Sequence, residues 1–273
     1  MKDSGLALIK KNNIPMLAVD LFAQTGKAEA FFATRQGGCS EGICGTMSLN
    51  IFKKMNDPYA RQNFDIFCSA IGVEPRVLVA NHETHTDIVT VVDKESIKQD
   101  VFDTTEYVDA DGMVTNSKDI CLFLYASDCA MLFFLDPKKE ALGACHAGWV
   151  GSINGIIGKT VCLMTQEYGS DPQDILVAIS PTIGPCCYCV DASRYEKILA
   201  YDPRLDEFVE KKDGVYFLDL TAINQFVVMQ TGIPKQNITA SRLCTSCCAD
   251  LFHSYRRDEG KNGVNGAFLR LLP

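Results

Sequence analysis

The chain has 273 residues, of which 47% are hydrophobic, and its formal net charge is −8. This length and apolar content suffice for a substantial core, and no linker divides the chain, so a single domain is expected over residues 1–273. The modest acidic excess argues against a nucleic-acid binder, which would usually carry a basic patch.

Neither the N-terminus nor the centre of the chain resembles a membrane segment. The first apolar stretch is short and interrupted by lysines, unlike a signal-peptide core. The densest apolar run, residues 121–135, contains Ser127 and Asp128 and falls short of a membrane span. We therefore predict a cytoplasmic protein that binds no membrane.

The first third of the chain predicts strands around one helix. Residues 15–35 alternate enough for two strands, and a glycine-rich loop follows at 36–45. Asn56-Asp57-Pro58 predicts the start of a helix that runs to about residue 70 and stops near Gly72. RVLVA and DIVTVV are expected as strands on either side of the loop NHETHT.

The centre of the chain is dense in predicted strands, and helices follow. GMVTN, CLFLYAS, AMLFFLD and ALGACHA are expected as strands, two of them buried on both faces. A helix is expected over 151–169, a strand in DILVAIS, helices in ASRYEKILAY, in LTAINQFVVMQTG and over 244–257, and a last strand in GAFLRLL. The mixture predicts an α/β or α+β fold, with a large mixed β-sheet and outer helices.

Scarce histidines and one cysteine suggest where the chemistry lies. The chain has four histidines against thirteen cysteines, most of which would be small buried thiols. Cys129 and His146 are 17 residues apart, which matches two neighbouring strands and their connection, and His85 lies in a loop between two strands. Two histidines and one cysteine form a three-ligand zinc set that leaves the fourth position open for water or substrate.

A second group of cysteines competes as a metal site. Cys244-x-x-Cys247, with Cys248 beside it, looks like half of a zinc knuckle. The bunched Cys186, Cys187 and Cys189 are not an obvious second half, so a structural zinc is the weaker hypothesis here.

Arginines are the natural ligands of a phosphate or carboxylate group, because the guanidinium fork gives paired hydrogen bonds. Arg35, before the glycine-rich loop, and the adjacent Arg256 and Arg257 are the candidates, each against the alternative of a surface salt bridge. The chain has no P-loop, no GxGxxG after a strand and no GxSxG, which excludes the usual nucleoside-triphosphate, dinucleotide and serine-hydrolase sites.

Seven motifs in order resemble one known family over nearly the whole chain. FFATRQGGCS resembles its TRxGGVS, ETHT stands where it has QVHG, DADGMVTN resembles DAxVTN, and ASDC resembles TADC. CHAGWVG resembles AHAGWRG, SPTIGPCCYCV resembles GPxIGPCCYEV, and CTSCCADLFHSYRRDEG resembles CTxC…FxSYRRD. This is the YfiH-like family, long labelled multicopper polyphenol oxidoreductase or laccase and more recently described as purine nucleoside phosphorylase with adenosine deaminase activity.

The resemblance implies a fold, a site and a set of substrates. It implies a layered α/β sandwich of the family's own type, and a zinc ion held by His85, Cys129 and His146. The implied substrates are phosphate and the purine nucleosides adenosine, inosine, guanosine and methylthioadenosine. The products are a free base with ribose 1-phosphate, or inosine with ammonia.

Three departures from the family motifs bear on this expectation. Thr86 replaces a glycine beside the ligand histidine, Glu83 replaces a glutamine, and Val150 stands where an arginine is usual. If that arginine holds phosphate, the change weakens phosphorolysis and leaves metal binding intact.

Two reactions are expected of such a pocket. In deamination, zinc would activate a water that attacks C6 of adenine, with Glu83 or Asp128 as candidate acids. In phosphorolysis, phosphate held by Arg35 or by the Arg256–Arg257 pair would attack the ribose C1′.

Three other functions remain open at the level of sequence. Cys129 with His146 or His85 as base could serve as the nucleophile of a cysteine hydrolase or amidase. A copper-dependent polyphenol oxidase is less favoured, because only His82 and His253 remain beyond the trio. The last alternative is a binding module that keeps the pocket without turnover.

Overall fold

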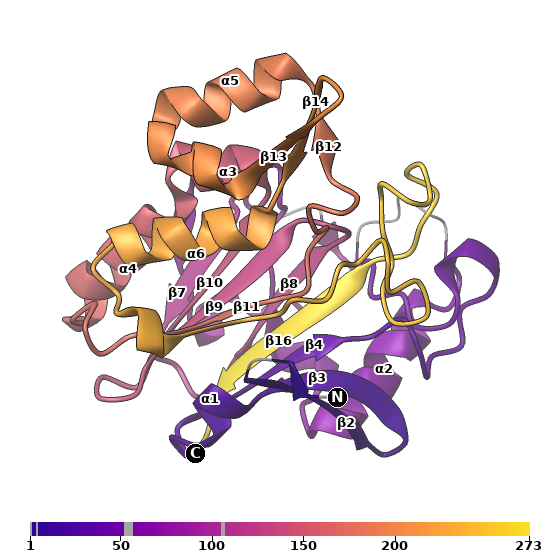
Figure 1. Cartoon of the computed structure of the whole chain (residues 1–273). Coiled ribbons are helices and arrows are strands. Elements are labelled where there is room, and N and C mark those ends of the chain that lie inside the picture. The colour runs from indigo at the N-terminus through magenta and orange to yellow at the C-terminus, as the bar shows by residue number, and fades with distance from the viewer. Residues whose placement is uncertain (1, 4, 52–56, 105–106) are drawn as a thin grey trace.

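A computed structural model describes residues 2–3, 5–51, 57–104 and 107–273, and it is built on two large β-sheets and one small one (Figure 1). The first sheet has seven strands in the order β1 (Lys2–Asp3), β2 (Leu6–Lys11), β3 (Ile14–Val19), β4 (Ala28–Ala33), β16 (Asn265–Leu271), β8 (Cys121–Ala126) and β5 (Leu78–Val79). All neighbours are antiparallel except β5 and β8. Asn12 and Asn13, with φ of 48° and 65°, form the two-residue turn between β2 and β3.

The second sheet has six strands and carries the centre of the chain. Its order is β15 (Ile238–Ala240), β11 (Leu176–Ile179), β9 (Ala130–Asp136), β10 (Ala141–Ala147), β7 (Gly112–Thr115) and β6 (Val89–Val91). β9 and β10 form an antiparallel hairpin in which His146 pairs with Met131. β11 and β15 are parallel, so the loops that follow them leave the sheet at the same end.

The two large sheets pack face to face with helices on both outer faces. Phe32 of β4 stacks on Phe133 of β9 at 5.2 Å between ring centroids, in the core that the sheets share. Helix α2 (Ala60–Ile71) covers the outer face of the first sheet, where Phe67 stacks on Phe268 at 4.7 Å. Helices α4 (Ile156–Tyr168) and α6 (Leu220–Gln230) cover the outer face of the second sheet (Figure 1). The predicted layered α/β fold with outer helices is confirmed, with two large sheets in place of one.

A small unit lies beyond α6 at the end of the molecule where α5 is labelled in Figure 1. It contains β12 (Cys189–Val190), β14 (Val215–Leu218) and β13 (Val209–Lys212), in that order, with α5 (Ala192–Tyr201) packed on them. That residues 1–273 form one domain stays a prediction.

Most predicted elements are present at the expected positions. The two strands predicted over 15–35 are β3 and β4, and the one predicted at 112–116 is β7. The later predicted strands are also present: β8 in CLFLYAS, β9 in AMLFFLD, β10 in ALGACHA, β11 in DILVAIS and β16 in GAFLRLL. Helix α2 ends at Ile71, before Gly72, whose φ of 69° suits glycine. It begins at Ala60, later than the predicted first turn at Asp57 and Pro58, and Asn56 lies outside the described residues. The helices predicted in ASRYEKILAY and LTAINQFVVMQTG are α5 and α6.

Two helix predictions need correction. The helix predicted over 151–169 is divided into α3 (Trp149–Asn154) and α4 at Gly155, which takes a left-handed φ of 93°. The helix predicted over 244–257 is wrong, because this segment is a series of turns. The Arg256 N–H, for example, donates to the Asp128 carboxylate, so tertiary hydrogen bonds replace those of a helix.

One short helix, α1 (Asp20–Ala23), precedes β4. None of the helices in the described part of the chain is both long and apolar enough to cross a bilayer.

Candidate active site

His85, Cys129 and His146 come from three separate segments and converge at one end of the second sheet. Cys129 directly precedes β9, His146 is the sixth residue of β10, and His85 lies in the loop between β5 and β6. Their ligand atoms all lie within 4.8 Å of one another. The Cys129 Sγ is 3.9 Å from the His85 Nε2, and the two imidazole centroids are 4.9 Å apart. The β9–β10 pairing brings Cys129 to His146, as the spacing in the sequence predicts.

Asp111 organises two of these three side chains. Its Oδ1 lies 2.8 Å from the His146 Nδ1 and accepts a 3.1 Å hydrogen bond from the His85 N–H. The backbone of Thr84 and both the backbone and hydroxyl of Thr86 donate to its other oxygen. The carboxylate thereby leaves the Nε2 of His146 as the ring nitrogen available to a ligand.

The loop that carries His85 is shaped around this carboxylate. His85 has a left-handed φ of 63°, an uncommon conformation for a residue with a side chain. Three successive N–H groups, those of Thr84, His85 and Thr86, point at Asp111 and hold the turn. Thr86, which replaces the family's glycine, adds its hydroxyl to the same carboxylate, so the substitution fits the loop.

Gly148 leaves the space in which the trio meets. A Cβ at this position would lie 2.9 Å from the Cys129 Sγ and 3.3 Å from the His85 Cδ2. Because its backbone is extended, with φ of −68°, glycine is needed here for space rather than for conformation. This agrees with the close approach to a ligand that the glycines around His146 suggest.

The surrounding charges favour a thiolate next to an imidazolium. Burial raises the pKa of the Cys129 thiol, but hydrogen bonds and charge from His146 and His85 outweigh it and lower the pKa to about 6. Burial lowers the pKa of His146, but the charge of Glu83 and the bond to Asp111 outweigh it and raise that pKa well above its usual range. The thiolate form is the one that binds metals and acts as a nucleophile.

Glu83 is an acid enclosed beside this pair. Its side chain is 3% exposed and one oxygen lies 3.9 Å from the His146 Nδ1. The other oxygen accepts a hydrogen bond from the Tyr125 N–H. Burial raises the pKa of Glu83 to about 8, and the positive charge of His146 opposes this only in part.

The donor set fits a zinc ion. Two imidazoles and one low-pKa thiol are the ligand types zinc prefers, and three protein ligands leave one position for water or substrate. A carboxylate on the far nitrogen of a ligating histidine, as Asp111 is on His146, is a common support of such sites.

The trio faces a cavity of about 530 Å³. Aromatic side chains form much of its wall: Tyr125, Trp149, Tyr188 and Tyr255. Two cations, Arg194 and Arg256, also line it, together with the carboxyl groups of Glu83 and Asp128 and the neutral side chains of Asn50 and Asn262. Its size and its apolar walls with a few polar groups suit a small organic ligand.

The three predicted arginines occupy different positions. Arg256 lines the cavity, and its Nη1 donates to the Cys189 carbonyl at 2.9 Å. Arg35 and Arg257 are not among the residues that line it. Arg35 donates to the carbonyls of Gly45 and Ala249, and Arg257 pairs with Asp258 and donates to the Thr245 carbonyl.

Sequence reasoning missed Asp111 and Arg194. A signal for Asp111 was present: it precedes β7, and the pairing of Gly112 with Cys145 sets it beside His146, whose N–H donates to its carbonyl. No sequence signal marked Arg194, because its place depends on how α5 packs over the cavity.

The other two histidines lie apart from the trio. His82 pairs with Asp109 at 2.7 Å. His253 is buried, which lowers its pKa to about 4, and its Nε2 meets the Met47 carbonyl. Neither belongs to a metal-binding group among the described residues.

Comparison with known proteins identifies the family. The family model described as multi-copper polyphenol oxidoreductase laccase matches residues 29–271. The chain belongs to this family. A relative from Geobacillus stearothermophilus named purine nucleoside phosphorylase YlmD is 36% identical over 247 residues, or 89% of each protein. Its namesake from Bacillus subtilis is 30% identical over 259 residues, or 93% of each.

Solved structures support the same family and fold. A crystal structure of the Bacillus licheniformis hypothetical protein YfiH matches with a TM-score of 0.88 at 31% identity, covering 94% of this chain and 96% of that one. The crystal structure of YlmD from Geobacillus stearothermophilus has the same TM-score at 28% identity, over the whole of both chains. The resemblance to the YfiH-like family is thus confirmed.

Proposed function

We propose that this chain is a zinc-dependent purine nucleoside phosphorylase that also deaminates adenosine. Its substrates would be adenosine, inosine, guanosine and methylthioadenosine, with phosphate. The observation that carries the proposal is the meeting of His85, Cys129 and His146 at the wall of an aromatic cavity large enough for a nucleoside. The names of the relatives support the reaction.

His85, Cys129 and His146 would hold the metal, with Asp111 fixing the ring of His146. A bound zinc ion supplies Lewis acidity and brings the pKa of a water toward neutrality. Copper is the less favoured metal, since the trio is a single three-ligand site. All thirteen cysteines are free thiols, which agrees with a place in the reducing cytoplasm.

Phosphate would bind at the cationic side of the cavity. Arg256 and Arg194 line it, and the Arg256 guanidinium lies 5.3 Å from the Tyr188 ring centroid, which fixes its plane. Arg35 and Arg257 would brace the loops around this side, because their guanidinium groups donate to backbone carbonyls. Phosphate oxygen attacks the ribose C1′, the bond from C1′ to the base nitrogen breaks, and the base leaves with a proton.

Glu83 is the acid that we assign to deamination. Burial raises its pKa to about 8, so it can take up a proton near neutral pH and donate it to the departing ammonia while water adds to C6 of adenine. Asp128, the other candidate, already accepts hydrogen bonds from the Thr245 hydroxyl and the Arg256 N–H. Aromatic side chains such as Trp149 and Tyr188 would hold the planar base.

A cysteine hydrolase is the second candidate, because the pKa of Cys129 is about 6 and two histidines are in reach. In that case Cys129 attacks an amide carbonyl and His146 or His85 moves the proton. Such an enzyme would keep its activity in chelator and lose it to iodoacetamide.

The test combines metal analysis with product analysis. Purified protein is assayed for zinc and incubated with adenosine with and without phosphate. Phosphate-dependent adenine with ribose 1-phosphate supports phosphorolysis, and inosine with ammonia supports deamination. Cys129→Ala should lower both activities more than about 100-fold. Substitution of a residue that only hydrogen-bonds to a metal ligand already lowers metal affinity or activity by about 10–100-fold, and Cys129 would be a ligand itself. Cys162→Ala, at an exposed thiol on α4, is the matched control.

Nucleoside cleavage at the wild-type rate by Cys129→Ala would overturn the proposal. So would activity that persists after chelation removes all zinc, which would favour the hydrolase instead.

A further inference from the structure

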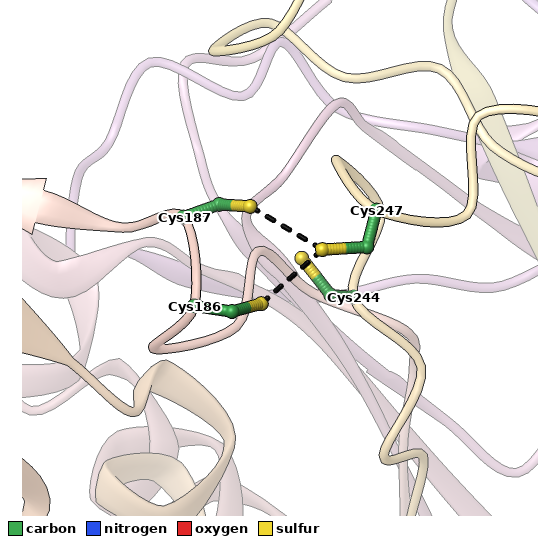
Figure 2. Close-up of side chains that lie close together, drawn as sticks. All are labelled: Cys186, Cys187, Cys244 and Cys247. Carbon is green, nitrogen blue, oxygen red and sulfur yellow. Dashed lines mark hydrogen bonds between the residues drawn. The ribbon is translucent and has the colours of Figure 1, made fainter.

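Four cysteine sulfurs meet at a second place, apart from the trio (Figure 2). Cys186 and Cys187 lie in the loop after β11, and Cys244 and Cys247 lie in the loop after β15. All four sulfur atoms are within 4.8 Å of one another. The Cys247 Sγ is 3.3 Å from that of Cys186 and 3.4 Å from that of Cys187.

The backbone brings these cysteines together without any cross-link. β11 and β15 are parallel neighbours, so their loops emerge side by side. The loops stay paired beyond the strands through a bridge between Thr182 and Cys244, where the Thr245 N–H donates to the Thr182 carbonyl at 2.9 Å. Gly184 allows the close approach, because a Cβ there would lie 3.2 Å from the Cβ of Cys244.

Burial does not explain this cluster. Cys186 and Cys247 are exposed and Cys187 is half-buried, whereas cysteines that act as small hydrophobes are buried in a core. Nor is it a set of disulfides, because all four thiols are free. Tetrahedral zinc with sulfur at about 2.3 Å holds its four sulfurs roughly 3.8 Å apart, within the spread seen here.

The surroundings of Cys244 also suit a bound thiolate. Its Sγ accepts a 3.2 Å hydrogen bond from the Gly184 N–H. The backbone N–H groups of Cys247 and Ser246 also point at this sulfur. Backbone N–H groups that point at sulfur stabilise thiolate ligands.

We propose that Cys186, Cys187, Cys244 and Cys247 bind one structural zinc ion. Four protein ligands leave no position open for substrate, and the residues that line the cavity do not include these cysteines. The proposal is independent of the metal and activity assigned to the trio.

The role of this ion is to fix one wall of the cavity. Ile183 and Tyr188 line the cavity and flank Cys186 and Cys187 in the sequence. On the other loop, the Thr245 hydroxyl donates to the carboxylate of Asp128, the residue before Cys129. Joining the two loops therefore positions both the wall and the segment that carries Cys129.

The first test counts metal in the full chain, purified in reductant without chelator. Elemental analysis of Cys247→Ser should show one zinc per chain fewer than the wild type, and Cys162→Ser should match the wild type. Cys129→Ala should keep the cluster's ion. Its cobalt-substituted form should show the strong thiolate-to-cobalt charge transfer of a four-sulfur site. This separates the cluster from the trio, whichever of the two holds metal.

The second test uses wild-type protein, so it does not depend on folding of a variant. Protein is first stripped of metal with a chelator that is then removed, and iodoacetamide labelling with and without added zinc is followed by peptide mass spectrometry. Cys186 and Cys247 should be protected at least ten-fold by zinc, and the exposed Cys162 should label equally in both. Equal metal content in wild type and Cys247→Ser, equal labelling with and without zinc, or a disulfide among the four in reduced protein would overturn the proposal.

Discussion

The molecule has two sites where sulfur and other soft ligands converge, and they are built in opposite ways. The trio of His85, Cys129 and His146 has three ligands, a carboxylate behind one of them and a cavity in front. The cysteine cluster has four ligands of one kind, on two loops that parallel strands carry side by side.

The comparison shows how the number of ligands and the groups around them distinguish a site suited to catalysis from one suited to a structural role. A site with three ligands and an enclosed acid, such as Glu83, can accept a substrate and move protons. Four thiolates closed around a zinc ion would leave no position for substrate, so the role that we propose for the cluster is to hold chain segments together. Changes at the first site should therefore alter chemistry and leave the second site intact.

The largest effect that sharpens this contrast is expected at Asp111. Asp111→Asn removes the charge that supports His146 and keeps the shape, so the affinity of the trio for zinc, or kcat/KM, should fall about 10–100-fold. Isothermal titration with zinc and steady-state kinetics measure both. Asp109→Asn is the matched control, because Asp109 pairs with His82 outside the trio. Unchanged zinc affinity in Asp111→Asn would contradict the role given to this carboxylate.

A smaller effect is expected when the space between the ligands is filled. In Gly148→Ala the new methyl group would press on the Cys129 Sγ and the His85 ring, which should weaken zinc binding by roughly ten-fold, or about 1.4 kcal/mol. Gly158→Ala on α4 has open space around it and should keep wild-type zinc affinity. Competition with a zinc-binding dye measures this. If the two variants bind zinc equally well, Gly148 has no part in shaping the site.

The smallest effect concerns stability and pH in the metal-free protein. Burial raises the pKa of Glu83 from 4.5 to about 8, so between these values the folded chain holds a proton that the unfolded chain has released. The free energy of unfolding should then fall as pH rises through this window, by up to about 1.4 kcal/mol per pH unit. Glu83→Gln should make that slope shallower, and its amide carbonyl can still accept from Tyr125.

Urea unfolding of chelated protein between about pH 5 and about pH 8 measures the slope. Because the charge of Glu83 also raises the pKa of His146, the difference between the two slopes reports the coupled titration of Glu83 and His146. Glu140→Gln is the control, because its two lysine partners lower the pKa of Glu140 to about 2, below the window. Equal slopes for wild type and Glu83→Gln would show that Glu83 is ionised in the folded state.

Local sequence patterns predicted most of the helices and strands, because the spacing of apolar residues along the chain matches the faces that those elements bury. β9 and β10 are buried throughout and apolar apart from Asp136 and His146, since both faces of the second sheet are covered, and their spacing brought Cys129 to His146. The turns at 244–257 were mistaken for a helix, because apolar spacing cannot reveal that Asp128 would take the Arg256 N–H. The meeting of the four cysteines was not predicted for a similar reason, since the two halves of the cluster lie about sixty residues apart.

By itself the sequence determined the layered class of the fold and the family, and it predicted that the three residues of the trio would meet. These depend on residue type, short spacing and motif order, which are properties of the chain. Only the tertiary structure decided that Asp111 supports His146, that Arg256 but neither Arg35 nor Arg257 lines the cavity, and that four cysteines meet. Those outcomes depend on the order of the strands and on which loops leave the same end of a sheet. Contacts between segments that are distant in the sequence produce no periodic pattern of residues, so the sequence alone does not reveal them.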